Sequence, residues 1–208
     1  VQGEKSLLGE YQANNANFKF KTKNIDYVFM SDNHGDHCLL FPLLVKRGFK
    51  GKAFVPEGFV DIFKPMALDS ANIMERNALD LTKKFKKNYS PIYDNGDVYA
   101  ATMLLEECEF NKKIKIDEDI TVEFVPAGHT LHSSGIILYI KNGNTIKKIA
   151  FTGDMGNIAM PKLFTNTFQP IQSSNLLISE TTYADAKRSA NGKDREKDIE
   201  KIKSIVYD

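Results

Sequence analysis

The chain has 208 residues and a mass of 23.5 kDa, enough to bury the core of one ordinary domain; 42% of its residues are hydrophobic and 26% are charged. Its 28 basic and 27 acidic residues give a net charge of +1, which excludes whole-chain electrostatics as an argument for nucleic acid but not a local basic groove. No apolar run approaches the roughly 18 residues of a membrane span, and no signal peptide is expected at Val1. Two cysteines, Cys38 and Cys108, are too few for a disulfide framework, so we expect a reducing cytoplasm.

The first half of the chain predicts strands that alternate with helices. The expected elements are an edge strand at 18–22, a buried strand at 25–30, a helix at 38–47, a strand at 52–55, a helical region from 56 to about 87, and a short helix after the turn at 91–96. Gly48 should end the first of these helices, and Pro65 should kink or split the long helical region. The 14 phenylalanines lie largely in apolar runs, so we expect them in the core rather than in a stacking platform.

The second half predicts hairpins. Apolar runs separated by turn residues lie at 105–110, 112–117, 120–126, 134–140 and 145–152, which is typical of an antiparallel meander. A last strand is expected at 175–179 and an amphipathic helix at 193–207. Strands alternating with helices, followed by hairpins, predict an α/β layered sandwich.

The histidines are few and clustered, and the first cluster follows the predicted buried strand. In the segment Ser31-Asp-Asn-His-Gly-Asp-His37, Asp32 and His34 are two residues apart and should point to the same side of an extended loop. Gly35 allows a tight turn, so that Asp36 and His37 can converge on them. Crowded imidazole and carboxylate groups suit zinc, manganese or iron. The alternative is a polar loop with histidines by chance.

Three further segments follow predicted strands. They are Pro126-Ala-Gly-His129-Thr-Leu-His132, Phe151-Thr-Gly-Asp154 and Ile178-Ser-Glu180-Thr-Thr-Tyr-Ala-Asp185. Each alone has an ordinary explanation, because His129 suits a hydrogen-bonded turn, Asp154 a common Gly-Asp turn and Glu180 a helix cap. Their order and spacing together favour one site.

The four segments resemble the motifs of the metallo-β-lactamase superfamily, and specifically of its β-CASP branch of RNA- and DNA-processing nucleases. That branch includes cleavage/polyadenylation-type endonucleases and RNase J relatives. Its pattern is His-x-His-x-Asp-His after a strand, then Gly-His, then Thr-Gly-Asp, then Glu-x-Thr-Tyr-Gly-Asp. This chain has the four motifs in the same order from residue 32 to residue 185, with Asp32 in place of the first histidine and Ala184 in place of the last glycine. The resemblance implies an αββα sandwich within the α/β class.

The resemblance also implies a site with two divalent metal ions, zinc first, with manganese or iron as alternatives. One metal would be held by Asp32, His34 and His129, the other by Asp36 and His37, and Asp154 would bridge both. A metal-bridging hydroxide would be the nucleophile. Asp36, Asp154 and Glu180 are the residues expected to be catalytic, with Glu180 in acid–base support or in contact with a ligand.

The pattern is broken at several places. Asp32 stands where the family has its first histidine, and a carboxylate there would shift metal preference, weaken the first metal or mark a lost activity. His132 stands where the family has a small residue; we expect a hydrogen-bonding or steric role for it, with metal or substrate contact as the alternative. The resemblance also makes the fold incomplete at both ends, with residues 1–180 as a core lacking its first strands and 181–208 leading into an absent cap. The histidine that completes the second metal's ligands would then lie beyond Asp208.

The function expected from the resemblance is metal-dependent hydrolysis of phosphodiesters, in a ribonuclease. Two alternatives remain open: a hydrolase of small esters, lactones or thioesters on the same fold, and a catalytically degraded scaffold subunit of an RNA-processing complex. The expected partner is RNA, with DNA as the alternative substrate; a homodimer is kept as an option, and no membrane is expected.

Overall fold

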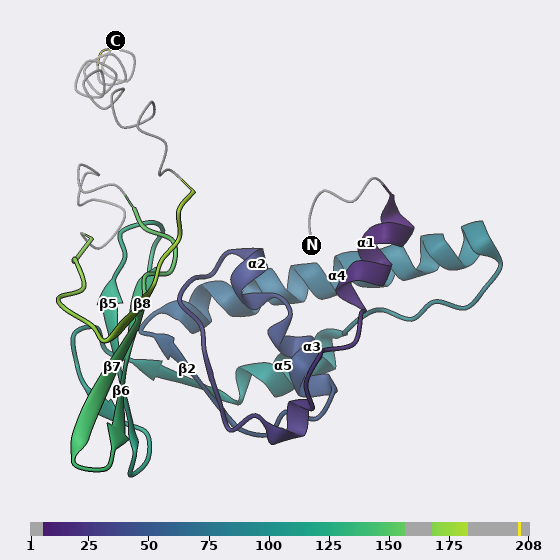
Figure 1. Cartoon of the computed structure of the whole chain (residues 1–208). Coiled ribbons are helices and arrows are strands. Elements are labelled where there is room, and N and C mark those ends of the chain that lie inside the picture. The colour runs from purple at the N-terminus through teal and green to yellow at the C-terminus, as the bar shows by residue number, and fades with distance from the viewer. Residues whose placement is uncertain (1–5, 157–167, 183–203, 205–208) are drawn as a thin grey trace. The chain divides into compact units, whose positions relative to one another are not determined.

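The computed structural model describes residues 6–156, 168–182 and 204, which fall into two compact units, Val1–Ile178 and Ser179–Asp208. The elements of the first unit are α1 (Leu7–Asn14), η1 (Thr22–Asn24), β1 (Tyr27–Phe29), α2 (Gly35–Cys38), α3 (Phe41–Lys46), β2 (Lys52–Pro56), α4 (Phe59–Phe85), α5 (Asn95–Thr102), β3 (Leu105–Cys108), β4 (Ile114–Lys115), β5 (Ile120–Pro126), β6 (Ser134–Asn142), β7 (Thr145–Phe151) and β8 (Leu176–Ile178). Figure 1 shows their arrangement. The α/β class predicted from the sequence is confirmed.

Two sheets form the centre of the first unit. The smaller sheet has the order β1-β2-β3, and all its pairs are parallel. The larger sheet has the order β4-β5-β6-β7-β8, and its pairs are antiparallel except for β7 with β8. Parallel neighbours need a crossover, and α4 and α5 supply the crossover between β2 and β3.

Apolar side chains fill the space between the two sheets and the space between the smaller sheet and its helices. Phe54 of β2, Val122 and Phe124 of β5 and Ile136 of β6 belong to one buried cluster, which joins the sheets face to face. The other face of β2 packs with the helices in a second cluster, where Phe63 of α4 is fully buried. Because both of its faces are covered, β2 is a continuous apolar run rather than an alternating one.

Two expected strands need correction. The stretch 18–22 forms no strand, because Phe18 and Phe20 stack on each other at 5.3 Å and the chain turns into η1. The run at 105–110 does not join the hairpins, since β3 pairs parallel to β2 in the other sheet. The helix α1 was not expected. The amphipathic helix predicted at 193–207 falls outside the described residues, apart from Ser204.

Pro65 does not split α4, which runs unbroken for 27 residues. A proline inside a helix forfeits one hydrogen bond and costs about 3 kcal/mol. Phe63 and Ala67 on either side of Pro65 are fully buried, so tertiary packing offsets that cost. The helix therefore continues where local propensity predicts a break.

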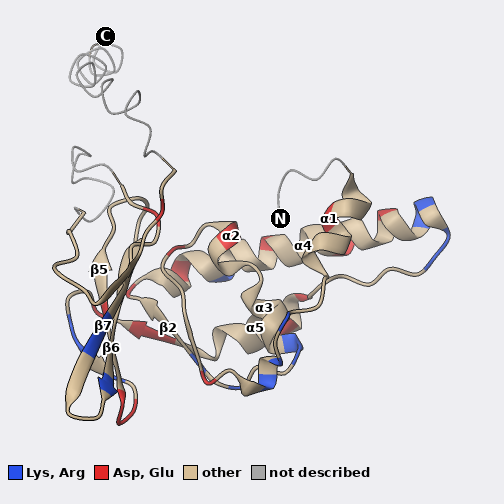
Figure 2. Cartoon of the chain, viewed as in Figure 1, with Lys and Arg blue, Asp and Glu red and all other residues tan. Residues whose placement is uncertain are grey.

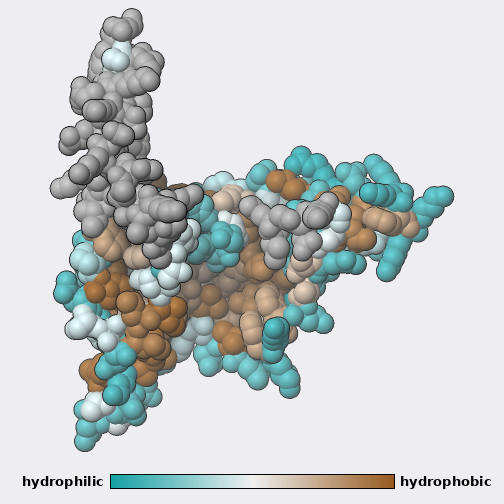
Figure 3. Space-filling model, turned by 45° about the horizontal axis from the view of Figure 1, so that its top comes forward, coloured by the Kyte–Doolittle hydropathy of each residue, from teal (hydrophilic) through white to brown (hydrophobic). Residues whose placement is uncertain are grey.

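The larger sheet exposes apolar side chains along its edge strand β8. Leu176, Leu177 and Ile178 are each about half exposed, and Figure 3 shows hydrophobic side chains at the surface over this sheet. None of the helices in the described part of the chain is long and apolar enough to cross a membrane.

Candidate metal centre

Three loops from different strands bring the predicted ligands to one edge of the two sheets. Asp32 and His34 follow β1, and His129 lies in the connection from β5 to β6. Asp154 follows β7. The end of a strand in an α/β layer is where a site is commonly built, because the loops there are free to carry polar groups.

Asp32 is buried completely and organises the first loop. Its Oδ1 accepts a hydrogen bond from the backbone N–H of His34 at 2.6 Å, and Nδ1 of the same histidine lies 2.9 Å from that oxygen. Its Oδ2 accepts a hydrogen bond from Oγ1 of Thr130 at 3.3 Å. A buried carboxylate requires such donors, because desolvation without them is costly. Asp32 therefore fixes the position of His34 and ties the first loop to the loop that carries His129.

Two serines and a glycine join the loops more closely. The backbone N–H and the Oγ of Ser134 both donate to the carbonyl oxygen of Ser31, at 2.8 and 3.0 Å. Gly153, with φ +59°, approaches the same point: a Cβ there would lie 2.6 Å from the carbonyl oxygen of Ser134 and 3.1 Å from Cβ of Ser31. The Thr-Gly-Asp turn therefore needs its glycine, because any side chain would push Asp154 away from the other loops.

Ser133 holds the loop that carries His129. Its Oγ accepts hydrogen bonds from the backbone N–H groups of His129 and Thr130 at 2.9 and 3.0 Å. Ser133 itself is 2% exposed, so this loop is fixed from its inner side. Sequence reasoning missed this residue and Thr130, since serine and threonine in a turn are too common to be informative.

Asp154 lies between two histidines. Its Oδ2 is 3.6 Å from Nε2 of His129 and 3.4 Å from Nε2 of His37. Nε2 of His37 is also 3.8 Å from Oδ2 of Asp36, which is largely exposed. One carboxylate oxygen thus faces the ligands expected for the first metal and those expected for the second.

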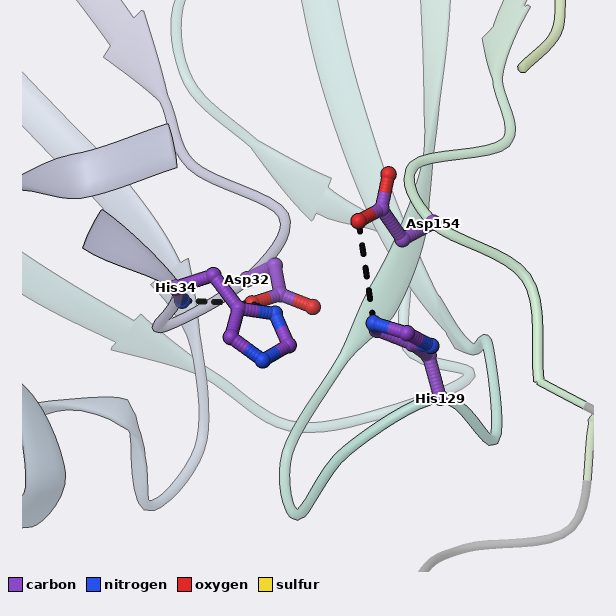
Figure 4. A group of neighbouring side chains, drawn as sticks. All are labelled: Asp32, His34, His129 and Asp154. Atoms are coloured by element: carbon purple, nitrogen blue, oxygen red, sulfur yellow. Dashed lines mark hydrogen bonds and ion pairs between the residues drawn. The ribbon is translucent and has the colours of Figure 1, made fainter. Parts of the chain in front are cut away.

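Four of these side chains form one close group. Figure 4 shows them, with Asp32 and His34 facing His129 and Asp154 across the loops. One ligand atom of each residue lies within 4.8 Å of the others. Ligand atoms about 2.0–2.2 Å from one metal are at most ~4.4 Å apart, so a small closure of the group would enclose an ion. Two imidazoles and two carboxylates form a donor set suited to zinc, manganese or iron. The residues present therefore fit a metal.

The thiol beside this group differs from the ligands. Cys38 follows His37 directly, but its Sγ contacts the carbonyl oxygens of Asn33 and His34, and only 1% of the residue is exposed. Burial, and then the nearby charge of Asp32, raises the pKa of this thiol to about 12. A metal binds the thiolate rather than the thiol, so Cys38 is a core residue here.

The packing of the His132 ring agrees with the steric part of the sequence expectation and not with its hydrogen-bonding part. Its backbone is left-handed, with φ 62°, and its ring lies against Gly58, the residue that precedes α4. Gly58 is itself left-handed, with φ +80°, and a Cβ there would come within 2.2 Å of Cε1 of His132. Nδ1 of His132 is buried without a hydrogen-bond partner among the described residues.

Gly58→Ala is expected to lower the free energy of unfolding by about 2 kcal/mol or more, because the left-handed backbone penalises an L residue and the new methyl group meets the ring. Urea denaturation measures the loss. In a His132→Gly background the ring is absent, so the cost of Gly58→Ala should fall to that of the backbone alone. Equal costs in the two backgrounds would contradict the contact.

The predicted site residues are therefore distributed unevenly. The structure brings together Asp32, His34, His129 and Asp154, and it places His37 next to Asp154. Asp36 is near His37 but is not part of the close group. Glu180 belongs to the second unit, where Ser179 donates a hydrogen bond to its carbonyl oxygen, and its catalytic role stays a prediction.

Comparisons with known proteins give relatives but no family model that matches. A ribonuclease of Thermus thermophilus is 24% identical over 176 residues, which are 85% of this chain and 36% of the relative. An RNase J-like protein of Methanocaldococcus jannaschii is 30% identical over 165 residues, 79% of this chain and 33% of the relative. This chain spans about a third of the length of these relatives. Among solved structures, a B3 metallo-β-lactamase with an active-site glutamic acid has a TM-score of 0.38 and 13% identity, over 64% of this chain and 43% of that one.

Proposed function

The chain belongs to the metallo-β-lactamase superfamily, in its β-CASP branch of RNA-processing proteins, and from this premise we propose that it is a metal-dependent nuclease that hydrolyses phosphodiesters in RNA. The observation that carries the proposal is the position of Asp154. Its Oδ2 lies within 3.6 Å of histidines from two separate loops, as a carboxylate shared by two metals requires. The relatives named as ribonucleases support RNA as the substrate.

We assign the first metal to Asp32, His34 and His129 and the second to Asp36 and His37, with Asp154 shared between them. When bound, such a pair of ions lowers the pKa of a water molecule and neutralises charge on the attacked phosphate. The chain's own contribution is to hold the ligands: Asp32 caps the backbone of His34, and Ser133 fixes the backbone of His129. Glu180 is proposed as the residue of acid–base support.

Two alternative functions are distinguished by substrate. A small-molecule hydrolase on this fold would use the same ligands, so only the class of bond that is cleaved separates it from a nuclease. A scaffold subunit would keep the fold and lose the metal. Asp32, in place of a histidine, is the observation that favours the scaffold.

The test is cleavage by the full chain after removal and return of metal. Protein treated with a chelator is supplied with zinc or manganese and mixed with labelled single-stranded RNA, the matching DNA, and a small ester and lactone. We expect cleavage of RNA that depends on metal, together with bound metal in elemental analysis. If the protein binds metal but cleaves only the ester or lactone, the nuclease is excluded in favour of a small-molecule hydrolase. If the protein binds no metal, both hydrolases are excluded in favour of a scaffold subunit.

Three further expectations remain proposals. The cytoplasm is supported by Cys38 and Cys108, which are both free and buried. The division into a core of residues 1–180 and a connecting segment of 181–208 rests on the family resemblance. A homodimer remains an option, which light scattering of the full chain would decide.

A further inference from the structure

A basic hollow lies at the other end of the smaller sheet from the metal ligands. Its lining includes Phe18, Phe20, Lys21, Lys23, Arg47 and Lys50. The segment 18–24 precedes β1 and residues 47–50 precede β2, whereas the metal loop follows β1. Because β1 and β2 are parallel, the hollow lies at the amino-terminal ends of these strands and the metal ligands lie at the carboxyl-terminal end of β1.

Positive charge gathers in the lining of this hollow. Lys21, Lys23 and Lys50 are exposed, and none of them makes an ion pair with a described residue. No acidic residue lines the hollow. Figure 2 shows Lys and Arg near η1 and the end of α3, in a chain whose net charge is only +1.

An exposed aromatic ring lies among these charges. Phe20 is 51% exposed, so the expectation that the phenylalanines all belong to the core is wrong for this residue. Its ring stacks on Phe18 at 5.3 Å and 20°, and the guanidinium carbon of Arg47 lies 5.2 Å from the centre of the Phe18 ring.

Arg47 also fixes the local structure. Its Nη1 and Nη2 donate to the carbonyl oxygens of Ala16 and Asn15 at 2.7 and 2.8 Å, and Oγ1 of the buried Thr22 donates to the carbonyl oxygen of Arg47. The ring of Phe20 is therefore held in place before any ligand binds, because one of its faces packs on Phe18 and Phe18 in turn packs against Arg47.

We propose that this hollow is a second binding surface for single-stranded RNA, on which a base stacks against Phe20 and the backbone phosphates meet Lys21, Lys23 and Lys50. An exposed ring offers a stacking surface to any base, and lysines offer charge to any phosphate, so binding should not depend on sequence. The inference rests on the proposed function, because an RNA that is cleaved at the metal ligands would extend away from them and could reach the hollow. We prefer RNA to an acidic protein as the occupant because the hollow offers an exposed aromatic ring, on which a base can stack, as well as positive charge.

The chain contains a matched control. Lys83, Lys84 and Lys87 lie at the end of α4, next to Phe85, which is 42% exposed. Lys84 lies over Phe85 and Lys87 over Tyr89. This cluster has comparable charge and an exposed aromatic ring, but it lies on the end of a long helix rather than in the hollow lined by η1 and α3.

The experiment measures the dissociation constant of a labelled oligouridylate of about 16 nucleotides for the full chain. Fluorescence anisotropy in EDTA is used, so that cleavage plays no part. Phe20→Ala should raise this dissociation constant about ten-fold, whereas Phe20→Tyr, which keeps an aromatic ring, should leave it near the wild-type value. Replacing Lys21, Lys23 and Lys50 by alanine should reduce the salt dependence, as the slope of log K against log salt, by about 2. Replacing Lys83, Lys84 and Lys87 should change both values by much less.

The outcomes separate this inference from the proposed function. Equal losses of RNA affinity in the hollow and control variants would overturn the inference, because charge alone would then account for binding. An RNA affinity that none of the variants changes would also overturn it. Normal hollow-dependent binding in a protein that cleaves no RNA would overturn the proposed function and keep the inference.

Discussion

Asp154→Asn is expected to abolish metal-dependent cleavage of RNA and to remove bound metal. Loss of a group that only supports a ligand costs about 10–100-fold in metal affinity or activity, and loss of the shared ligand should cost more. The reason is geometric: Oδ2 of Asp154 lies 3.4 Å from Nε2 of His37 and 3.6 Å from Nε2 of His129. Asparagine keeps the shape of the side chain, so the fold should survive.

The measurement is metal content after dialysis, beside the rate of RNA cleavage, because metal content reports the site even where activity is lost. Asp119→Asn is the control, since it removes an exposed carboxylate from the turn between β4 and β5. Asp154→Asn with two metals still bound and cleavage intact would exclude the shared position. Loss of metal in the control would show that the effect is not specific to the site.

Asp32→His is expected to move metal preference towards zinc. A carboxylate is a harder ligand than an imidazole, so wild-type protein should bind manganese relatively better than the variant does. The measurement is the ratio of the zinc and manganese dissociation constants, obtained by competition with a chelator. An unchanged ratio would mean that Asp32 is not a ligand and acts only as the acceptor for the N–H of His34 and for Thr130.

The same position separates an active site from a degraded one. Asp32→Ala should cost about 1–3 kcal/mol of stability, because the backbone N–H of His34 and the hydroxyl of Thr130 lose the buried carboxylate that accepts their hydrogen bonds. In an active protein it should also abolish cleavage. Gain of cleavage in Asp32→His from an inactive wild-type protein would instead favour a degraded scaffold, and circular dichroism would verify that each variant is folded.

Much of the candidate site could be predicted from the sequence because it consists of short segments that follow apolar strands. The spacing of Asp32 and His34, and the positions of His129 and Asp154 after strands, were sufficient to propose a common site. The predicted strands at 25–30, 120–126 and 145–152 agree with β1, β5 and β7 within a few residues. Apolar runs between turn residues are local features, so no tertiary information was needed to find them.

The errors have a different origin. The run at 105–110 has the composition of any strand, and only packing of α4 and α5 against the smaller sheet places β3 beside β2. Pro65 has a strong local preference that burial of Phe63 and Ala67 overrides. Phe20 lies in an alternating stretch typical of a strand, but its ring remains half exposed because no partner strand is available.

The sequence by itself determined the class of fold, the kinds of ligand and the order in which they occur, since these follow from residue type and from the periodicity of apolar residues. Only the tertiary structure decided that Oδ2 of Asp154 lies between His37 and His129, that Ser134 ties the loops through the carbonyl of Ser31, and that Thr130 donates a hydrogen bond to Asp32. The physical reason is that each of these contacts joins groups from different turns or strands at hydrogen-bond or ligand distance. Their positions depend on how two sheets pack, and a linear pattern of residues carries no measure of that distance.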